Sequence, residues 1–223
     1  MSKVLVVAAH PDDEVLGAGG TMAKFADSGH EVYTLILSKG ITSRRNPSDD
    51  IEKKLLSLEN QFFKANEYLG VKQCFQLDFP DNSFDTVPLL DIIQEVEKIK
   101  NEIRPDIVFT HHQNDLNIDH QLTYKAVLTS SRSLKTETVK EIYSFEVLSS
   151  TEYSYPLTFS PNYFIDISEY VEKKINAMNI YKDELREFNH PRSLQGIKLN
   201  AEVWGMKVGV QFAEAFQAIR ILK

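Results

Sequence analysis

Residues 4–14 of this 223-residue chain read VLVVAAHPDDE, a continuous apolar run followed by a histidine, a proline and three acidic residues. A strand in which every residue is apolar is typical of a sheet that is covered on both faces. We therefore expect residues 4–8 to form a central strand of a parallel sheet. The polar cluster begins where this strand ends, at the edge where open α/β sheets bind their ligands.

Downstream of this run, patterns typical of strands and helices alternate. Apolar residues recur at helical spacing in several segments, and Gly29 and Gly70 follow two of them, as glycines often follow helices. Helices are predicted over residues 21–28, 51–69, 89–103 and from 120 to about 133, and strands over residues 31–37, 74–77, 106–110 and 141–147. This alternation predicts an α/β fold with a doubly wound, mainly parallel sheet and helices on both faces.

The last third of the chain extends this pattern. We predict a strand over Tyr163–Ile167 and a long helix that is capped by Ser168 and runs to about Phe188. No internal repeat or low-complexity linker separates this part from the rest of the sequence. We therefore expect residues 1–223 to form a single domain, in which the last third is an elaboration.

The composition limits the classes of partner. A hydrophobic content of 42% and a charged content of 26% are ordinary for a globular protein. The net charge of −7 disfavours nucleic acid, because phosphate contacts need clustered Lys and Arg, and pairs such as Arg44-Arg45 are too small for that. The sequence leaves open a homo-oligomer.

The location is expected to be cytoplasmic. No apolar run approaches the length of a membrane span, so we expect no integral membrane contact. Residues 1–9 are too short for the charged and hydrophobic regions of a signal peptide. The single cysteine, Cys74, excludes an internal disulfide and lies in a predicted strand, so we expect a buried and inert thiol.

The first polar motif contains His10, Asp12, Asp13 and Glu14, four groups that hold protons or metals, within five residues. Neighbouring carboxylates repel one another unless a cation neutralises them, so the cluster predicts a metal. The alternative is an acidic helix N-terminus, where carboxylates complement the helix dipole. The histidine in front of the acids, at the end of an apolar strand, favours the metal.

A second cluster, THHQNDLNIDH over residues 110–120, follows the fourth predicted strand. In the usual order of a doubly wound sheet the first and fourth strands are neighbours, so the loops after them face each other. His10 and Asp13 from one loop and His120 from the other then make a His₂-Asp set. Three protein ligands with an open position are typical of a catalytic zinc site.

The motifs His10-Pro11-Asp12-Asp13-Glu14 and Asn117-Ile118-Asp119-His120 resemble those of the PIG-L/LmbE deacetylases. Two later stretches, His190-Pro191-Arg192-Ser193 and Ala213-Glu214-Ala215-Phe216, are similar to stretches in bacterial members of that family. The resemblance implies a Rossmann-like fold and a hydrolase that uses Zn²⁺ to remove the N-acetyl group from an amino sugar or sugar conjugate.

The resemblance also implies roles for single residues. The zinc ligands of the family fall on His10, Asp13 and His120, and its general base falls on Asp12. Asn117 stands where several members carry a histidine that helps to stabilise the oxyanion, and its amide could donate the same hydrogen bond. Asp119 either orients a neighbouring ligand or is an exposed loop carboxylate.

Some features keep more than one interpretation. The family's Arg-Gly pair near the C-terminus is replaced by Trp204-Gly205, so the resemblance does not extend to substrate contacts of that arginine. His111 and His112 are rival ligands on spacing alone, with a hydrogen-bonded structural role as the alternative. Arg192 either holds a phosphate or carboxylate of an activated sugar or forms a surface ion pair, and His190 has no preferred role.

Three other functions are alternatives to the deacetylase. A dinucleotide-binding oxidoreductase needs G-x-G-x-x-G directly after the first strand. The glycines of residues 17–20 come too late for that motif, and we expect them to allow close helix–strand packing. A metallophosphoesterase also uses His and Asp at strand ends, but its two-metal site needs further ligands. The third alternative is a non-catalytic sugar-binding protein that has retained a metal site.

Overall fold

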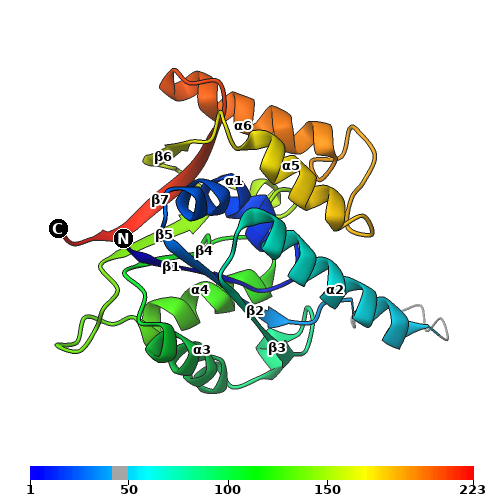
Figure 1. Cartoon of the computed structure of the whole chain (residues 1–223). Helices are drawn as coiled ribbons and strands as arrows, with labels where there is room; N and C mark the ends of the chain where they lie inside the picture. Colours follow the sequence, from blue (N-terminus) through cyan, green and yellow to red (C-terminus); the bar gives the residue numbers. More distant parts are fainter. Residues whose placement is uncertain (42–49) are drawn as a thin grey trace.

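The computed structural model describes residues 1–41 and 50–223, so the basic pair Arg44-Arg45 lies outside the described residues. Strands and helices alternate along the first two thirds of the chain, as predicted (Figure 1). The strands are β1 (Lys3–Ala8), β2 (Glu31–Ser38), β3 (Gln73–Phe79), β4 (Ile107–His111), β5 (Glu141–Phe145), β6 (Tyr163–Asp166) and β7 (Ala213–Ile221). The helices are α1 (Asp13–Asp27), α2 (Ile51–Leu69), α3 (Leu89–Ile103), α4 (Ile118–Ser130), α5 (Val171–Ile180) and α6 (Leu194–Val208).

The described strands form one sheet in the order β3-β2-β1-β4-β5-β7-β6. The strands from β3 to β5 pair in parallel, and β7 is antiparallel to both of its neighbours. The predicted α/β fold with a mainly parallel sheet is therefore confirmed. The order also confirms that β1 and β4 are neighbours, so the loops that carry the two polar motifs leave the same sheet edge side by side.

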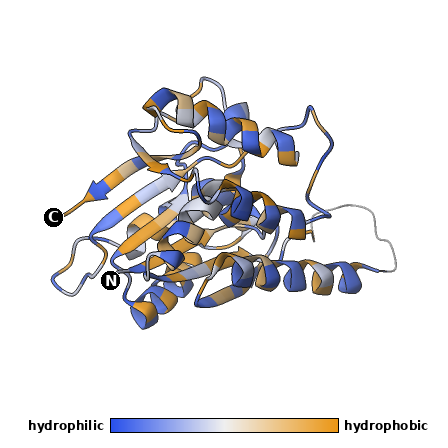
Figure 2. Cartoon of the chain, turned by 45° about the horizontal axis from the view of Figure 1, so that its top comes forward, coloured by the Kyte–Doolittle hydropathy of each residue, from blue (hydrophilic) through white to orange (hydrophobic). Residues whose placement is uncertain are grey.

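Helices cover both faces of the sheet (Figure 1). Alternate side chains of β1 explain why that strand is apolar throughout. Val4, Val6 and Ala8 belong to the core under α1, α2, α5 and α6, whereas Leu5 and Val7 belong to the core under α3 and α4. The helices alternate between hydrophobic and hydrophilic residues along their length, as expected for elements that cover a sheet on one side only (Figure 2).

Helix α1 begins at Asp13, and the prediction that it begins at residue 21 is wrong. The prediction treated the glycines as a break, but tertiary packing requires them inside the helix. A Cβ atom at Gly17 would lie 2.2 Å from the ring of Phe145, and one at Gly20 would lie 2.8 Å from Ile167. The expectation that these glycines allow close packing is confirmed.

A buried ion pair joins the two halves of α1. Ala18 has non-helical angles (φ −143°, ψ 15°), which leaves backbone groups on either side without helical partners. Lys174 Nζ donates to Leu16 O at 2.7 Å and to the Glu214 carboxylate at 2.6 Å. The same carboxylate accepts from the backbone N of Gly20 at 2.9 Å and of the next residue at 2.7 Å. Glu214 therefore caps the second half of the helix.

The last third of the chain differs most from the prediction. The long helix expected to reach Phe188 ends at Ile180, and α6 and β7 were not predicted. The strand expected at residues 163–167 is β6, at the edge of the sheet. Because β7 lies between β5 and β6, the last third of the chain contributes two strands to the same sheet as the first.

Two smaller expectations concern the membrane and the cysteine. In the part of the chain that the structure describes, no helix is both long and apolar enough to cross a membrane. Cys74 lies in β3 and is half-buried. Burial raises the pKa of its thiol to about 11, in agreement with the expected inert residue.

Candidate metal centre

The three predicted ligands meet at the carboxyl ends of β1 and β4. His10 follows β1, Asp13 is the first residue of α1, and His120 lies in the first turn of α4. One ligand atom from each lies within 4.8 Å of the other two. Two imidazole nitrogens and a carboxylate oxygen are a donor set that suits Zn²⁺, so these residues fit the ion that the sequence predicts.

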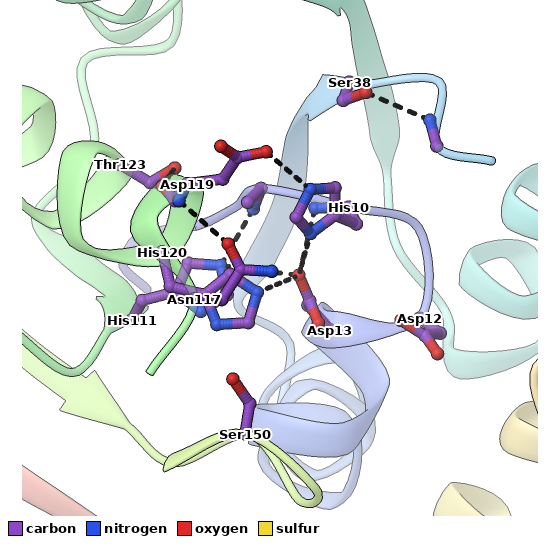
Figure 3. A network of polar contacts seen from close by, with 12 residues as sticks. His10, Asp12, Asp13, Ser38, His111, Asn117, Asp119, His120, Thr123 and Ser150 are labelled. Carbon is purple, nitrogen blue, oxygen red and sulfur yellow. Dashed lines mark hydrogen bonds and ion pairs between the residues drawn. The ribbon is translucent and has the colours of Figure 1, made fainter. Parts of the chain in front are cut away.

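Asp13 lies between the two histidines. Its Oδ2 atom is 3.3 Å from His10 Nδ1 and 3.2 Å from His120 Nε2, so each ring turns one nitrogen toward the same carboxylate oxygen (Figure 3). The same oxygen accepts a hydrogen bond from His10 N at 3.0 Å. A cation at this point would therefore meet three donor atoms that already converge.

Two further carboxylates face the other ring nitrogens. Asp119 Oδ2 is 2.9 Å from His10 Nε2, and Asp115 Oδ1 is 3.1 Å from His120 Nδ1. Asp119 is itself held by Phe84 N, which donates to its Oδ1 at 2.9 Å. Metal-bound histidines usually donate their second N–H to such a carboxylate, which fixes the ring orientation. His10 has such a hydrogen bond to Asp119, while Asp115 lies beside His120 at ion-pair distance, and in both rings the other nitrogen is directed at the centre.

The electrostatics agree with a cation at this position. Burial lowers the pKa of both histidines, but the carboxylates around them outweigh it, and the pKa is raised to about 10 for His10 and about 9 for His120. Burial raises the pKa of Asp13, yet His120 and His10 hold it well below its ordinary value. The cluster thus attracts positive charge strongly, whether as protons or as a metal ion.

The two rival histidines occupy other environments. His111 is fully buried at the end of β4, where its Nε2 accepts a hydrogen bond from Ala9 N at 2.8 Å and its ring stacks on His120 at 3.9 Å. Burial lowers its pKa well below the ordinary value, so it is neutral. His112 pairs with Thr158 at 3.0 Å. His111 Nε2 also lies 3.6 Å from Asp13 Oδ2, but neither histidine belongs to the converging set of three.

Asp12 is buried beside the ligands but does not join them. Its backbone is left-handed (φ 98°), its side chain points away from Asp13 in Figure 3, and its Oδ2 accepts a hydrogen bond from Arg192 Nη1 at 3.1 Å. Burial raises the pKa of its carboxyl well above the ordinary value, against the opposing effect of Arg192. Arg192 therefore forms an ion pair inside the site, not on the surface.

Asn117 is the N-cap of α4. Its side-chain oxygen accepts a hydrogen bond from Asp119 N at 2.8 Å, and its amide nitrogen donates to Asn82 Oδ1 at 3.0 Å. This arrangement places the amide at the rim of the site and gives it a structural task as well. Asp119 is completely buried, so the interpretation of an exposed loop carboxylate is wrong.

A cavity of about 200 Å³ opens over the cluster. Sequence reasoning missed Asp115 and Asp81, although Asp115 lies within the second motif and Asp81 Oδ1 is 3.4 Å from His10 Nε2. A carboxylate a few residues before a metal-binding histidine was the available indication for Asp115. The cavity is lined by His10, Pro11, Asp12, Asp13, Gly40, Ile41, Leu58, Asp81, Asn82, Asn117, His120, Val147, Ser149, Ser150, Glu184, Arg186 and Arg192.

Comparison with known proteins agrees with this geometry. The model of the PIG-L family, described as GlcNAc-PI de-N-acetylase, matches residues 5–131, which is more than half of the chain and includes both motifs. The chain belongs to the PIG-L family. Among curated proteins, the diacetylchitobiose deacetylase of Thermococcus kodakarensis is 26% identical over 235 residues, covering 98% of this chain and 84% of its own length.

Solved structures share the fold of this PIG-L protein. The N,N'-diacetylchitobiose deacetylase from Pyrococcus horikoshii, bound to its inhibitor MPG, has a TM-score of 0.80 and 23% identity, with 98% and 84% of the two chains covered. A zinc-inhibited form of the teicoplanin deacetylase Orf2 has a TM-score of 0.77 and 16% identity, with 98% of both chains covered.

One similar structure is a different kind of enzyme. GalB, the 4-carboxy-2-hydroxymuconate hydratase from Pseudomonas putida KT2440, has a TM-score of 0.78 and 21% identity, with 100% and 99% of the two chains covered. At these identities the likeness shows the fold alone, and one fold serves several reactions. The function of this chain therefore has to be argued from its site.

Proposed function

We propose that the chain is a metal-dependent hydrolase that removes the N-acetyl group from an amino sugar or a sugar conjugate, with Zn²⁺ as the metal. The observation that carries the proposal is the converging set of His10, Asp13 and His120, which opens into a cavity beside the further carboxylate of Asp12. Membership of the PIG-L family and the similarity to a diacetylchitobiose deacetylase support the substrate class.

His10, Asp13 and His120 would hold the ion and leave a coordination position open toward the cavity. When bound, such an ion lowers the pKa of water and polarises an amide carbonyl. Asp115 and Asp119 would keep the two imidazole rings in place through their second nitrogens. Asp115 and Asp119 would therefore act on the ligands, not on the substrate.

Asp12 would act as the general base. Arg192 Nη1 donates to its Oδ2, which leaves Oδ1 as the oxygen that would serve the substrate in the cavity that Asp12 lines. This oxygen would accept a proton from the attacking water and later return it to the leaving amine. The second transfer matters because an amine leaves poorly unless it is protonated. Asn117 would add a hydrogen-bond donor from the cavity rim, once its bond to Asn82 is exchanged.

The direct test is release of acetate from a panel of N-acetyl sugars and their phosphorylated, nucleotide-linked and carboxylate-linked conjugates. We expect acetate and free amine in equal amounts, loss of activity after chelation and recovery with added metal. Because a structural relative is found in a zinc-inhibited form, Zn²⁺ is titrated from below one equivalent and compared with Co²⁺, Mn²⁺ and Ni²⁺. Recovery with another of these ions but not with Zn²⁺ would contradict the choice of zinc.

Other outcomes assign the alternative functions. Phosphate release from phosphate esters without acetate release would make the chain a metallophosphoesterase. Metal-dependent sugar binding without any product would make it a sugar-binding protein. Either result would replace the deacetylase proposal, while metal content measured on the same samples would still report on the three ligands.

A further inference from the structure

The motif His190-Pro191-Arg192-Ser193 lies about 70 residues beyond the last predicted ligand, and the reaction outlined above assigns nothing to it. In the structure it connects the end of the loop after α5 to the start of α6, and it brings one guanidinium group to the metal centre. The question is whether Arg192 binds substrate or acts on the protein itself.

The backbone of this motif is fixed from both sides. Arg192 N donates to His190 Nδ1 at 3.1 Å, and Ser193 caps α6 by accepting from Gly196 N at 2.9 Å. A Cβ atom at Gly196 would lie 2.6 Å from Pro191 O, so the loop passes directly over the first turn of the helix. These contacts hold Arg192 at a fixed point at the start of α6.

The guanidinium is held at the other end as well. Its Nε donates to Ser149 Oγ at 2.7 Å, and its Nη1 donates to Asp12 Oδ2 at 3.1 Å and lies 4.0 Å from Glu184 Oε2. The side chain is 28% exposed, and that of Asp12 is 3% exposed. A planar group that bonds two partners through two of its edges has little freedom to turn toward a ligand in the cavity.

The fixed guanidinium of Arg192 restrains Asp12, which lies between the metal ligands His10 and Asp13 in sequence. A free carboxylate at this position could rotate toward the ion and become a further ligand. In the structure it is not part of the converging cluster, and its backbone N donates to Glu14 Oε2 at 3.1 Å. The backbone is thus fixed by Glu14 and the side chain by Arg192.

We propose that Arg192 is a positioning residue: it holds Asp12 Oδ2, keeps this carboxylate out of the metal ligand set and leaves Oδ1 to face the cavity. The proposal rests on the proposed function for the role of Asp12 in catalysis. The statement about the ligand set can be tested by metal binding alone, without any substrate.

The kinetic test uses Arg192→Met. We expect kcat to fall by about 10²-fold, the size of effect that a small misplacement of a reacting group produces, with KM within about twofold of wild type. Arg192→Lys should also lose kcat, because lysine keeps the charge but lacks the fork that reaches Ser149 and Asp12 together. Added guanidine should restore part of the kcat of Arg192→Met. A raised KM with unchanged kcat would make Arg192 a substrate-binding residue and overturn the proposal.

The metal-binding test uses a double-mutant cycle with Asp12→Asn and Zn²⁺ titration by competition with a chromophoric chelator. Arg192→Met should bind Zn²⁺ about tenfold more tightly, within the range that outer-shell groups exert, because the released carboxylate adds a ligand. Asp12→Asn should abolish that gain in the Arg192→Met background and change little in the wild-type background. A gain that persists in the double variant would reflect removal of positive charge only, and would overturn the proposal.

A control separates positioning from stability. Arg220, in β7, is a second partly buried arginine. It donates to Ser131 O at 2.7 Å and to Val139 O at 2.8 Å, and it lies far from the metal site. Arg220→Met should lower the melting temperature while kcat per folded molecule and Zn²⁺ affinity stay at the wild-type values. If wild-type protein releases no acetate, the proposed function fails, but the metal cycle still decides whether Arg192 restrains Asp12. Should Arg192→Met fail to fold, Arg192→Lys carries both measurements.

Discussion

At the scale of single residues, Asp12 and Asp13 are neighbours in sequence but have different surroundings. Asp13 lies between two histidines, whereas Asp12 turns away and pairs with Arg192. We expect Asp12→Asn to lower turnover by about 10²–10⁴-fold, the usual contribution of a general base, with metal retained. Asp13→Ala should lose both metal and turnover. Acetate release and elemental analysis of the same samples check this, and an emptied site in Asp12→Asn would exchange the two assignments.

Asn117 has two possible tasks that one substitution can separate. Its side-chain oxygen caps α4, and its amide nitrogen is the proposed donor to the reacting oxygen. Asn117→Ser keeps a good N-cap, so stability should change by no more than about 0.5 kcal/mol, but the amide N–H₂ is lost and the shorter hydroxyl does not reach its place, so turnover should fall by about 10²-fold. Asn117→Ala should lose both. Thermal unfolding and kcat are measured in parallel, and full turnover in the serine variant would leave only the capping role.

At the scale of whole elements, the kink in α1 depends on two side chains from distant parts of the chain. Lys174 from α5 and Glu214 from β7 are 5% and 3% exposed, and they satisfy the backbone groups that Ala18 leaves unpaired. Glu214→Gln should lower the free energy of unfolding by about 3–5 kcal/mol, because it leaves the buried ammonium without its counter-charge. Combining it with Lys174→Met should recover part of the loss.

Lys198 provides the matched control, because its pair with Glu172 is exposed at both ends. Lys198→Met should change the free energy of unfolding by no more than about 1 kcal/mol. Urea unfolding of these variants gives the comparison. An equal loss for the exposed and the buried pair would show that the link across the kink contributes nothing specific to α1.

The elements that sequence reasoning identified are those whose pattern is local. Amphipathic helices that end before a glycine or a proline were placed to within a few residues, as for α2, which Gly70 follows, and α3, which ends shortly before Pro105. The start of α1 and the whole of α6 were missed because both contain glycines that serve tertiary packing. Gly17 faces Phe145, and a Cβ at Gly205 would lie 2.6 Å from Gln211 O. Such contacts are not encoded in the spacing of neighbouring residues.

The site follows the same division. The two motifs were expected to meet because strand order brings the ends of β1 and β4 together, which follows from topology. Spacing alone left His111 and His112 as rivals of His120, and the family resemblance selected the set of His10, Asp13 and His120 that converges in the structure. The partner of Asp12 was not found, because Arg192 reaches it from a loop 180 residues away in sequence. No rule of periodicity or spacing predicts a contact between a loop and a strand end at that separation.

At the scale of the whole molecule, the metal site ties together segments that are distant along the chain. Two segments converge on one point. One is the loop after β1, and the other is the loop after β4, which carries Asp115 and leads into the start of α4. An ion that binds only the folded chain stabilises it in proportion to its affinity. At a free concentration of about 100 times its Kd, the gain is about 2.7 kcal/mol, or about 5–10 °C in melting temperature for a chain of this size.

Removal of metal with a chelator should therefore lower the melting temperature by about that amount, and added Zn²⁺ should restore it. His120→Ala should melt at a temperature that no longer depends on metal, because one of three ligands is gone. His30→Ala is the control: His30 accepts a hydrogen bond from Ser2 N at 3.2 Å and lies outside the cluster, so the metal-dependent shift should remain. A shift that survives in His120→Ala but disappears in His30→Ala would place the ion elsewhere, since stabilisation by a ligand must be lost with the residues that bind it.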